Sequence, residues 1–251
     1  MCYLELSGFM QKGTPREVSR KELLERAEVS PQILSTLVTK GIFENYGKEI
    51  SRLSNNPLHT ESPYPLSPIQ QKAYNEIIDR FSQKETVLLH GVTSSGKTEI
   101  YIHLIDTVLK QGRQVLYLVP EIALTTQLTT RLQRVFGNKL SIYHSKFTDN
   151  ERVEIWNDLL HDKGAQIILG VRSSIFLPFR DLGLVIVDEE HEGSYKQQEP
   201  SPRYHARNAA IVLASMHGAK TLLGTATPAI ESYYNAQCGK YGLVELSSRH
   251  E

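Results

Sequence analysis

Residues 87–98 read Val-Leu-Leu-His-Gly-Val-Thr-Ser-Ser-Gly-Lys-Thr, and this stretch decides the fold. Its last eight residues match the pattern Gly-x4-Gly-Lys-Thr, in which backbone N–H groups of a loop and of the next helix surround phosphate groups. The residues before the loop are apolar enough for a buried strand, and those after it have helical periodicity. The stretch therefore predicts a nucleotide-binding P-loop rather than an exposed Gly/Ser turn.

We expect a nucleotide to bind in this loop, whose candidate binding residues are Gly91, Thr93, Ser94, Ser95, Gly96, Lys97 and Thr98. The Lys97 ammonium would reach the β- and γ-phosphates, which makes it a candidate catalytic residue as well. The Thr98 hydroxyl would bind Mg²⁺. The loop therefore predicts ATP and Mg²⁺ as cofactors.

A second apolar run ends in acidic residues, because residues 184–191 read Leu-Val-Ile-Val-Asp-Glu-Glu-His. Ligands of α/β proteins bind at the carboxyl ends of parallel strands, which is where these acids would lie. Asp188 would hold Mg²⁺ directly or through water, and Glu189 would orient and deprotonate the attacking water. Such an acidic strand end is often only a solvated turn, but the P-loop on the same predicted sheet favours a catalytic site.

Short apolar runs alternate with helical stretches along most of the chain. The predicted strands are residues 87–90, 114–119, 141–143, 166–169, 184–187 and 221–223. The predicted helices are residues 97–110, 123–136, 149–161, 205–217 and 229–237. This alternation predicts an α/β fold, in which a parallel sheet is covered by helices on both faces.

The chain is expected to divide near residue 55. Residues 55–68 contain four prolines, which neither helix interiors nor central strands accommodate. We therefore predict a small N-terminal domain at 1–53, a linker at 54–66 and the nucleotide-binding lobe at 67–251.

Within the small domain, two helix starts are followed by a possible hairpin. Ser19 precedes one predicted helix, and Ser30 followed by Pro31 begins another. Residues 42–50 could then form a short hairpin, and this order of elements resembles a winged helix. Basic and acidic residues are nearly balanced here, so direct DNA contact and a purely packing role both remain open.

Composition excludes several classes of protein. The 251 residues include 28 Lys and Arg and 28 Asp and Glu, so no strongly basic balance points to nucleic acid, although a local groove is compatible with it. Two cysteines, Cys2 and Cys238, make neither a disulfide framework nor a four-thiolate zinc site. No apolar run approaches the roughly 20 residues of a membrane span and no leader opens the chain, so we expect a cytoplasmic protein without membrane contact.

Several further segments resemble helicase motifs. Residues 188–191 (Asp-Glu-Glu-His) and 224–229 (Gly-Thr-Ala-Thr-Pro-Ala) resemble motifs II and III of superfamily 2 helicases. Residues 118–125 resemble motif Ia, and residues 66–70 resemble the segment that places a glutamine, here Gln70, near the adenine.

Two other segments narrow the resemblance to the primosomal replication-restart helicases. They are residues 170–176 (Gly-Val-Arg-Ser-Ser-Ile-Phe) and the Tyr- and Arg-containing stretch 194–207, which resembles that family's aromatic-rich loop. The resemblance covers about residues 15–251 and implies a RecA-like lobe preceded by a winged helix. It also implies 3′→5′ DNA unwinding at stalled forks, with primosome assembly and loading of the replicative helicase. The implied partners are single-stranded and forked DNA, primosome proteins, the helicase loader and single-strand-binding protein.

The aromatic-rich stretch suggests how DNA and nucleotide sites are coupled. Tyr195 and Tyr204 would stack on bases, while Lys196, Arg203 and Arg207 would contact phosphates. The alternative is a surface loop whose tyrosines cover the edge of the core.

Other residues assigned to this coupling lie in the helicase-like motifs. They are Arg172, His191, Thr225 and Thr227. By resemblance, His191 would hydrogen-bond Thr225 or Thr227, although it could also simply satisfy a core position.

A helicase of this type needs a second RecA-like lobe with an arginine finger, and the family also carries a zinc module and a DNA 3′-end-binding domain. We therefore expect this chain to be part of a longer protein, with structural Zn²⁺ only outside it, and to hydrolyse ATP poorly or not at all by itself. Two alternatives remain: another superfamily 2 translocase, and a non-enzymatic winged-helix nucleotide sensor.

Overall fold

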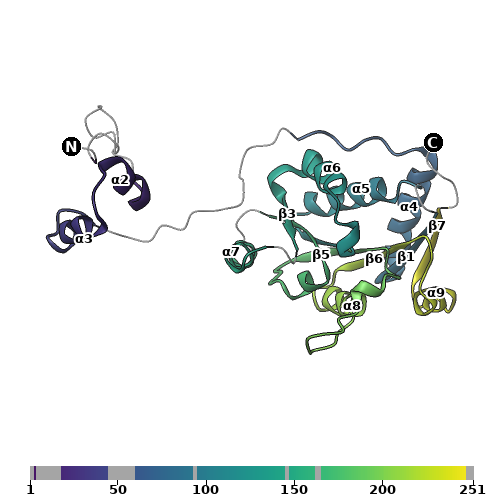
Figure 1. Cartoon of the computed structure of the whole chain (residues 1–251). Coiled ribbons are helices and arrows are strands. Elements are labelled where there is room, and N and C mark those ends of the chain that lie inside the picture. Colours follow the sequence, from purple (N-terminus) through teal and green to yellow (C-terminus); the bar gives the residue numbers. More distant parts are fainter. Residues whose placement is uncertain are drawn as a thin grey trace. The chain divides into compact units, whose positions relative to one another are not determined.

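The computed structural model describes residues 3, 18–44, 60–92, 95–144, 147–161 and 165–246. The chain forms two compact units, Met1–Ile50 and Ser51–Glu251 (Figure 1). The predicted boundary between residues 53 and 54 lies outside the described residues.

The N-terminal unit contains the two expected helices, α2 (Arg20–Ala27) and α3 (Pro31–Thr39). The Ser19 hydroxyl caps α2 by accepting a hydrogen bond from the Glu22 amide at 3.1 Å. Pro31 occupies the first turn of α3, where its missing N–H costs nothing. Most of the predicted hairpin, residues 45–50, lies outside the described residues.

The larger unit is built on a seven-stranded sheet of order β3-β4-β2-β5-β6-β1-β7, in which every neighbouring pair is parallel. The strands are β1 (Thr86–Gly91), β2 (Gln114–Leu118), β3 (Leu140–Tyr143), β4 (Ile167–Gly170), β5 (Leu182–Asp188), β6 (Lys220–Thr225) and β7 (Gly242–Leu246). The first six confirm the predicted strands to within two residues at each end. The seventh was not predicted, and it pairs with β1, whose carboxyl end leads into the P-loop.

Helices cover both faces of this sheet, as predicted (Figure 1). One face carries α4 (Pro68–Gln83), α5 (Lys97–Lys110) and α6 (Thr126–Phe136), and the other carries α7 (Asp149–Leu160), α8 (Ala206–Met216) and α9 (Ile230–Gln237). The helix expected from residue 123 begins at Thr126, because the Thr125 hydroxyl caps it by accepting from the Leu128 amide at 3.3 Å. Helix α4 was not predicted.

The core consists of two apolar layers, one on each side of the sheet. Leu89 and Ile186 face α4–α6, whereas the adjacent residues Leu88 and Val187 face α7–α9. Apolar side chains on both faces explain why these strands read as continuous apolar runs. None of the described helices is long and apolar enough to cross a membrane.

Candidate nucleotide site

The P-loop connects β1 with the N-terminus of α5. Gly96 has φ +77°, a left-handed conformation that favours glycine, and α5 begins at the next residue. The Lys97 ammonium donates a hydrogen bond to the Gly91 carbonyl at 3.0 Å. The buried Ser95 hydroxyl has no hydrogen-bond partner among the described residues, as expected for a loop built to receive an anion. Thr93 and Ser94 lie outside the described residues.

The acidic end of β5 lies directly beside this loop. A Glu189 carboxylate oxygen is 3.9 Å from the Lys97 ammonium, although the two residues are far apart in the sequence. Glu189 has φ +45°, an uncommon conformation for a residue with a side chain, and such outliers gather at functional sites. The fold thus brings the two predicted motifs together.

Two buried tyrosines hold the Asp188 carboxylate. The Tyr101 hydroxyl donates to Oδ1 at 3.0 Å and the Tyr117 hydroxyl donates to Oδ2 at 3.2 Å. Burial raises the pKa of both hydroxyls, so they stay protonated and act as donors. Burial also raises the pKa of Asp188 to about 6, and the charge of Glu189 adds to this effect. Neither tyrosine was predicted, although a tyrosine inside a buried strand signals that its hydroxyl has a partner.

Gln70 lies at the start of α4 and is buried. Its side-chain oxygen accepts from the Ser67 amide at 2.9 Å, and its Nε2 lies 3.5 Å from the Gly96 carbonyl. Gln70 therefore connects the first turn of α4 with the P-loop, and its expected contact with adenine stays a prediction.

His191 contacts both candidate threonines of β6 and the following turn. Its Nδ1 lies 2.7 Å from the Thr225 hydroxyl, and its Nε2 lies 3.2 Å from the Thr227 hydroxyl. The end of β5 is thus joined to the end of β6 by one imidazole, whose role in coupling stays a prediction.

The donor set fits a Mg²⁺–nucleotide complex. Thr98 and Asp188 supply the oxygen ligands that Mg²⁺ prefers, and Lys97 supplies a cation for phosphate. The described residues contain no group of three or more His, Cys, Asp or Glu that could hold a metal ion by themselves. Mg²⁺ usually takes its remaining ligands from phosphate and water.

The comparisons with known proteins agree with this geometry. A model of the DEAD/DEAH box helicase family matches residues 67–236. The chain belongs to the DEAD/DEAH box helicase family. A second model, of the winged-helix domain of PriA helicase from Bacteroidota, matches residues 1–50. Together they confirm the predicted fold, a RecA-like helicase lobe preceded by a winged helix.

Curated relatives narrow the resemblance further. The chain is 40% identical over 237 residues to replication restart protein PriA of Bacillus subtilis (strain 168), covering 93% of the chain and 29% of the relative. It is also 40% identical over 244 residues to PriA of Chlamydia pneumoniae, covering 96% of the chain and 32% of that protein. The chain thus spans about a third of the length of these relatives. A structure of RecG bound to a three-way DNA junction shares the fold, with a TM-score of 0.55 at 18% identity, covering 100% of this chain and 29% of that one.

The aromatic-rich loop of this helicase lobe differs from the sequence-based expectation at Tyr195. The Tyr195 side chain is not available to stack on a base, because the residue is only 1% exposed and packs in the core. Its hydroxyl lies 2.7 Å from the Asp188 carbonyl oxygen and 3.1 Å from the Leu118 carbonyl oxygen, and these two acceptors share its single proton. Tyr204 is partly buried, and its ring packs edge-on against Phe176, which is exposed.

The expectation that Arg207 contacts phosphate is also corrected. Arg207 is buried and pairs with the Glu190 carboxylate at 2.7 Å, so its charge is already compensated inside the lobe. Glu190 is fully buried and also accepts from the Ser232 hydroxyl at 2.7 Å and the Ala229 amide at 2.8 Å. Glu190 therefore joins motif II to α8 and α9.

The other basic residues of the loop lie nearer the surface. The Lys196 ammonium donates to the Arg203 carbonyl at 2.7 Å, and Arg203 itself forms an exposed ion pair with Glu199. Arg172 donates to the Ser194 carbonyl at 3.2 Å. Of the predicted phosphate contacts, Lys196 and Arg203 remain candidates.

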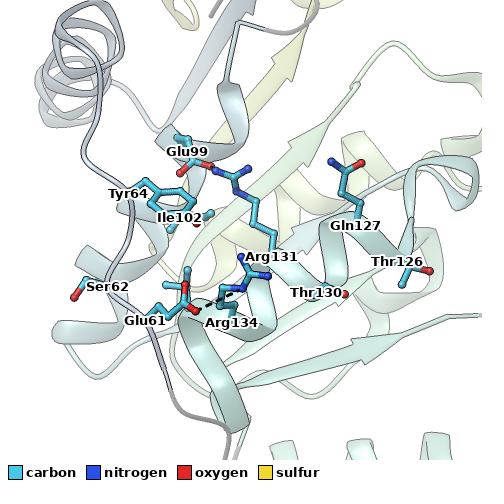
Figure 2. A pocket seen from close by; sticks show the side chains of 11 residues that line it. Glu61, Ser62, Tyr64, Glu99, Ile102, Thr126, Gln127, Thr130, Arg131 and Arg134 are labelled. Carbon is cyan, nitrogen blue, oxygen red and sulfur yellow. Dashed lines mark ion pairs between the residues drawn. The ribbon is translucent and has the colours of Figure 1, made fainter. Parts of the chain in front are cut away.

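Helices α5 and α6 are joined by a second ion pair, between the buried Glu99 carboxylate and the partly exposed Arg131 guanidinium, beside a pocket of about 360 Å³ (Figure 2). The Arg131 guanidinium also lies 5.5 Å from the centre of the Tyr64 ring. Tyr64 belongs to residues 60–66, the described part of the predicted linker. This segment is held against the lobe by a hydrogen bond that the Glu61 backbone N–H donates to the Arg134 carbonyl at 2.9 Å. No sequence pattern signalled the Glu99–Arg131 contact.

We expect Arg207→Ala to lower the free energy of unfolding of the chain by about 3–5 kcal/mol, because it leaves the buried Glu190 carboxylate without a counter-charge. Urea denaturation measures the change. The matched control is Arg203→Ala, which removes an exposed pair and should cost at most about 1 kcal/mol. If the two variants lost equal free energy of unfolding, Glu190 would not be a buried carboxylate that depends on Arg207 for its counter-charge.

Asp188 gives the nucleotide-free chain a dependence on pH. A carboxyl whose pKa is higher in the folded than in the unfolded chain binds more protons when folded, so its contribution to stability falls as pH rises from about 4 to about 6. Asp188→Asn removes this penalty. The difference in free energy of unfolding between the variant and the unmodified chain should therefore shift by about 1–3 kcal/mol in favour of the variant when the pH is raised from 4.5 to 7.5.

Denaturation at both pH values in the absence of nucleotide tests this expectation. Asp79→Asn, on the exposed face of α4, makes the same chemical change away from the site. A gain that is the same at both pH values for Asp188→Asn would contradict the prediction.

Proposed function

We propose that this chain is the winged-helix domain and first motor lobe of an ATP-dependent 3′→5′ DNA helicase of replication restart. The observation that supports the proposal best is the junction of motifs at one sheet edge. Lys97 of the P-loop lies 3.9 Å from Glu189, and His191 bonds both Thr225 and Thr227. A nucleotide sensor would need the phosphate-binding loop. It would need neither a hydrolytic base such as Glu189 nor the hydrogen bonds of His191 that connect this acidic motif with the Thr225–Thr227 motif.

In the proposed reaction, the P-loop amides and Lys97 bind the phosphates of ATP. Lys97 exchanges its bond to the Gly91 carbonyl for the phosphates, which leaves Glu189 free to orient water and accept its proton. Thr98 and Asp188 hold Mg²⁺, which when bound neutralises charge on the phosphate oxygens. Gln70 lies beside Gly96, from where it would contact the adenine.

DNA would act on this site through the aromatic-rich loop. The candidate contacts are Lys196, Arg203, the exposed Phe176 ring and the partly buried Tyr204 ring that packs against it, since cations and aromatic rings together bind single strands without sequence preference. Tyr195 transmits a shift of the loop, because its hydroxyl bonds the Asp188 carbonyl at 2.7 Å.

A second route for this coupling leads through the buried ion pair of Arg207. This pair connects the start of α8, where the loop ends, with Glu190, which follows Glu189 directly. Arg172 supports the loop from outside, through its bond to the Ser194 carbonyl.

The proposed setting is the stalled replication fork in the cytoplasm. The partners are single-stranded and forked DNA, primosome proteins, the replicative helicase loader and single-strand-binding protein. The winged helix is a candidate for additional DNA contact, and structural Zn²⁺ is proposed only for parts of a longer protein beyond this chain.

The test uses a protein of the relatives' length with this chain as its N-terminal or internal part. Forked substrates with a single-stranded arm of either polarity are incubated with Mg²⁺ and ATP, and strand separation and ATP hydrolysis are followed together. We expect unwinding with 3′→5′ polarity and hydrolysis stimulated by DNA. Translocation without strand separation would favour another superfamily 2 motor, and nucleotide binding without DNA-stimulated hydrolysis would favour a sensor.

A further inference from the structure

The Asp188 carboxylate is held by more protein contacts than its position at a strand end requires. Both of its oxygens accept a tyrosine hydroxyl, and Oδ1 also accepts the Glu189 amide at 3.1 Å. The two tyrosines come from different elements: Tyr101 lies on α5, one turn after Lys97, and Tyr117 lies on β2.

The two tyrosine rings support each other. Their centroids are 5.6 Å apart with an interplanar angle of 80°, an edge-to-face contact that fixes both rings. Both side chains are fully buried, so no water competes for their hydroxyl groups. Each hydroxyl is therefore held at the carboxylate rather than free to rotate to other partners.

Gly224 of β6 leaves the space in which this arrangement fits. A Cβ atom added at Gly224 would lie 1.8 Å from the Tyr101 hydroxyl oxygen and 3.4 Å from Asp188 Oδ1. Any side chain at this position would therefore displace the Tyr101 hydroxyl. Four segments of the lobe meet at one carboxylate: α5, β2, β5 and β6.

We infer that Tyr101 and Tyr117 are positioning residues that hold the Asp188 carboxylate in the orientation that binds Mg²⁺. A carboxylate that is free to rotate must lose that freedom when the metal binds, whereas one already fixed by two donors does not. This inference rests on the proposed nucleotide site and adds two residues that no helicase-like motif of the sequence pointed to.

The test measures binding rather than turnover. The Mg²⁺ concentration that half-saturates binding of a non-hydrolysable ATP analogue is determined by calorimetry on the chain, together with analogue affinity in EDTA. At pH 8, where Asp188 is ionised, we expect Tyr101→Phe and Tyr117→Phe each to raise the half-saturating Mg²⁺ concentration about tenfold. Affinity in EDTA should change less than twofold.

Tyr74→Phe is the matched control, because it removes a hydroxyl that bonds Thr107 at 2.8 Å between α4 and α5, away from Asp188. It should leave the Mg²⁺ dependence unchanged. Gly224→Ala offers an independent route, since it displaces the Tyr101 hydroxyl without removing it. If both changes act through the same bond, Gly224→Ala should add little to Tyr101→Phe.

The outcomes separate the inference from the proposed function. If the unmodified chain shows no Mg²⁺-dependent binding of the analogue, the nucleotide-site proposal fails and the inference fails with it. If the unmodified chain binds the analogue but both phenylalanine variants keep its Mg²⁺ dependence, only the inference is overturned. An equal loss of affinity with and without Mg²⁺ would also overturn it, because the tyrosines would then support the fold rather than the metal site.

Discussion

Glu189→Gln should nearly abolish ATP hydrolysis in a protein of the relatives' length while leaving ATP binding almost intact. An amide of the same shape occupies the position beside Lys97 but cannot accept a proton from the attacking water. General-base catalysis typically contributes about 10²–10⁴-fold, so kcat for DNA-stimulated hydrolysis should fall by that factor. ATP affinity should change little, because in the proposed complex Lys97 contacts phosphate rather than Glu189.

Glu192→Gln is the matched control, because it makes the same change three residues further along the same turn. It should retain most of the hydrolytic activity. Residual kcat above a tenth of the original value for Glu189→Gln would remove Glu189 from the role of base. A parallel loss of ATP affinity would instead show that the carboxylate organises the P-loop.

Lys97→Ala is expected to weaken binding of Mg²⁺–ATP or Mg²⁺–ADP to the chain by one to two orders of magnitude, measured by calorimetry. Lys97 is buried at the N-terminus of α5. Among the lysines and arginines that the structure describes, it is the only one whose charged group lies within 4 Å of the Glu189 carboxylate. Losing a hydrogen-bonded charge at a phosphate costs about 1.5–3 kcal/mol, which corresponds to roughly 10–150-fold in affinity.

The control for this variant is Lys110→Ala at the opposite end of the same helix, where the ammonium forms an exposed pair with Asp106. It should bind nucleotide as the unmodified chain does. Denaturation of both variants confirms that the fold is retained. Equal nucleotide affinity for Lys97→Ala and the unmodified chain would refute the site.

The parts of the site that depend on local sequence could be predicted. The P-loop, the acidic end of β5 and the turn after β6 each combine a short motif with an adjacent strand, and the parallel sheet then brings these strand ends together. The contact of His191 with Thr225 or Thr227 was expected from the family resemblance alone, and the pairing of β5 with β6 is what places these residues within reach of each other.

Which aromatic and basic side chains of the loop are exposed to solvent could not be predicted in the same way. Tyr195 and Arg207 have the side chains that single-stranded DNA binding uses, but the same side chains also serve as buried donors once a partner such as the Asp188 carbonyl or the Glu190 carboxylate lies opposite. Only the three-dimensional arrangement decides between these roles. Tyr101 was missed for a related reason, because in sequence it is one more large residue on the buried face of an amphipathic helix.

Strand β7 has a practical consequence for anyone who expresses this lobe. It is an edge strand that covers β1, and the Val92 amide just after β1 donates to the Leu246 carbonyl at 3.2 Å. A shorter version that ended before Gly242 would leave β1 as a bare, apolar edge, which is a template for aggregation. Insolubility of such a version would therefore reflect an unpaired strand next to the P-loop, and a soluble minimal lobe has to extend at least through Leu246.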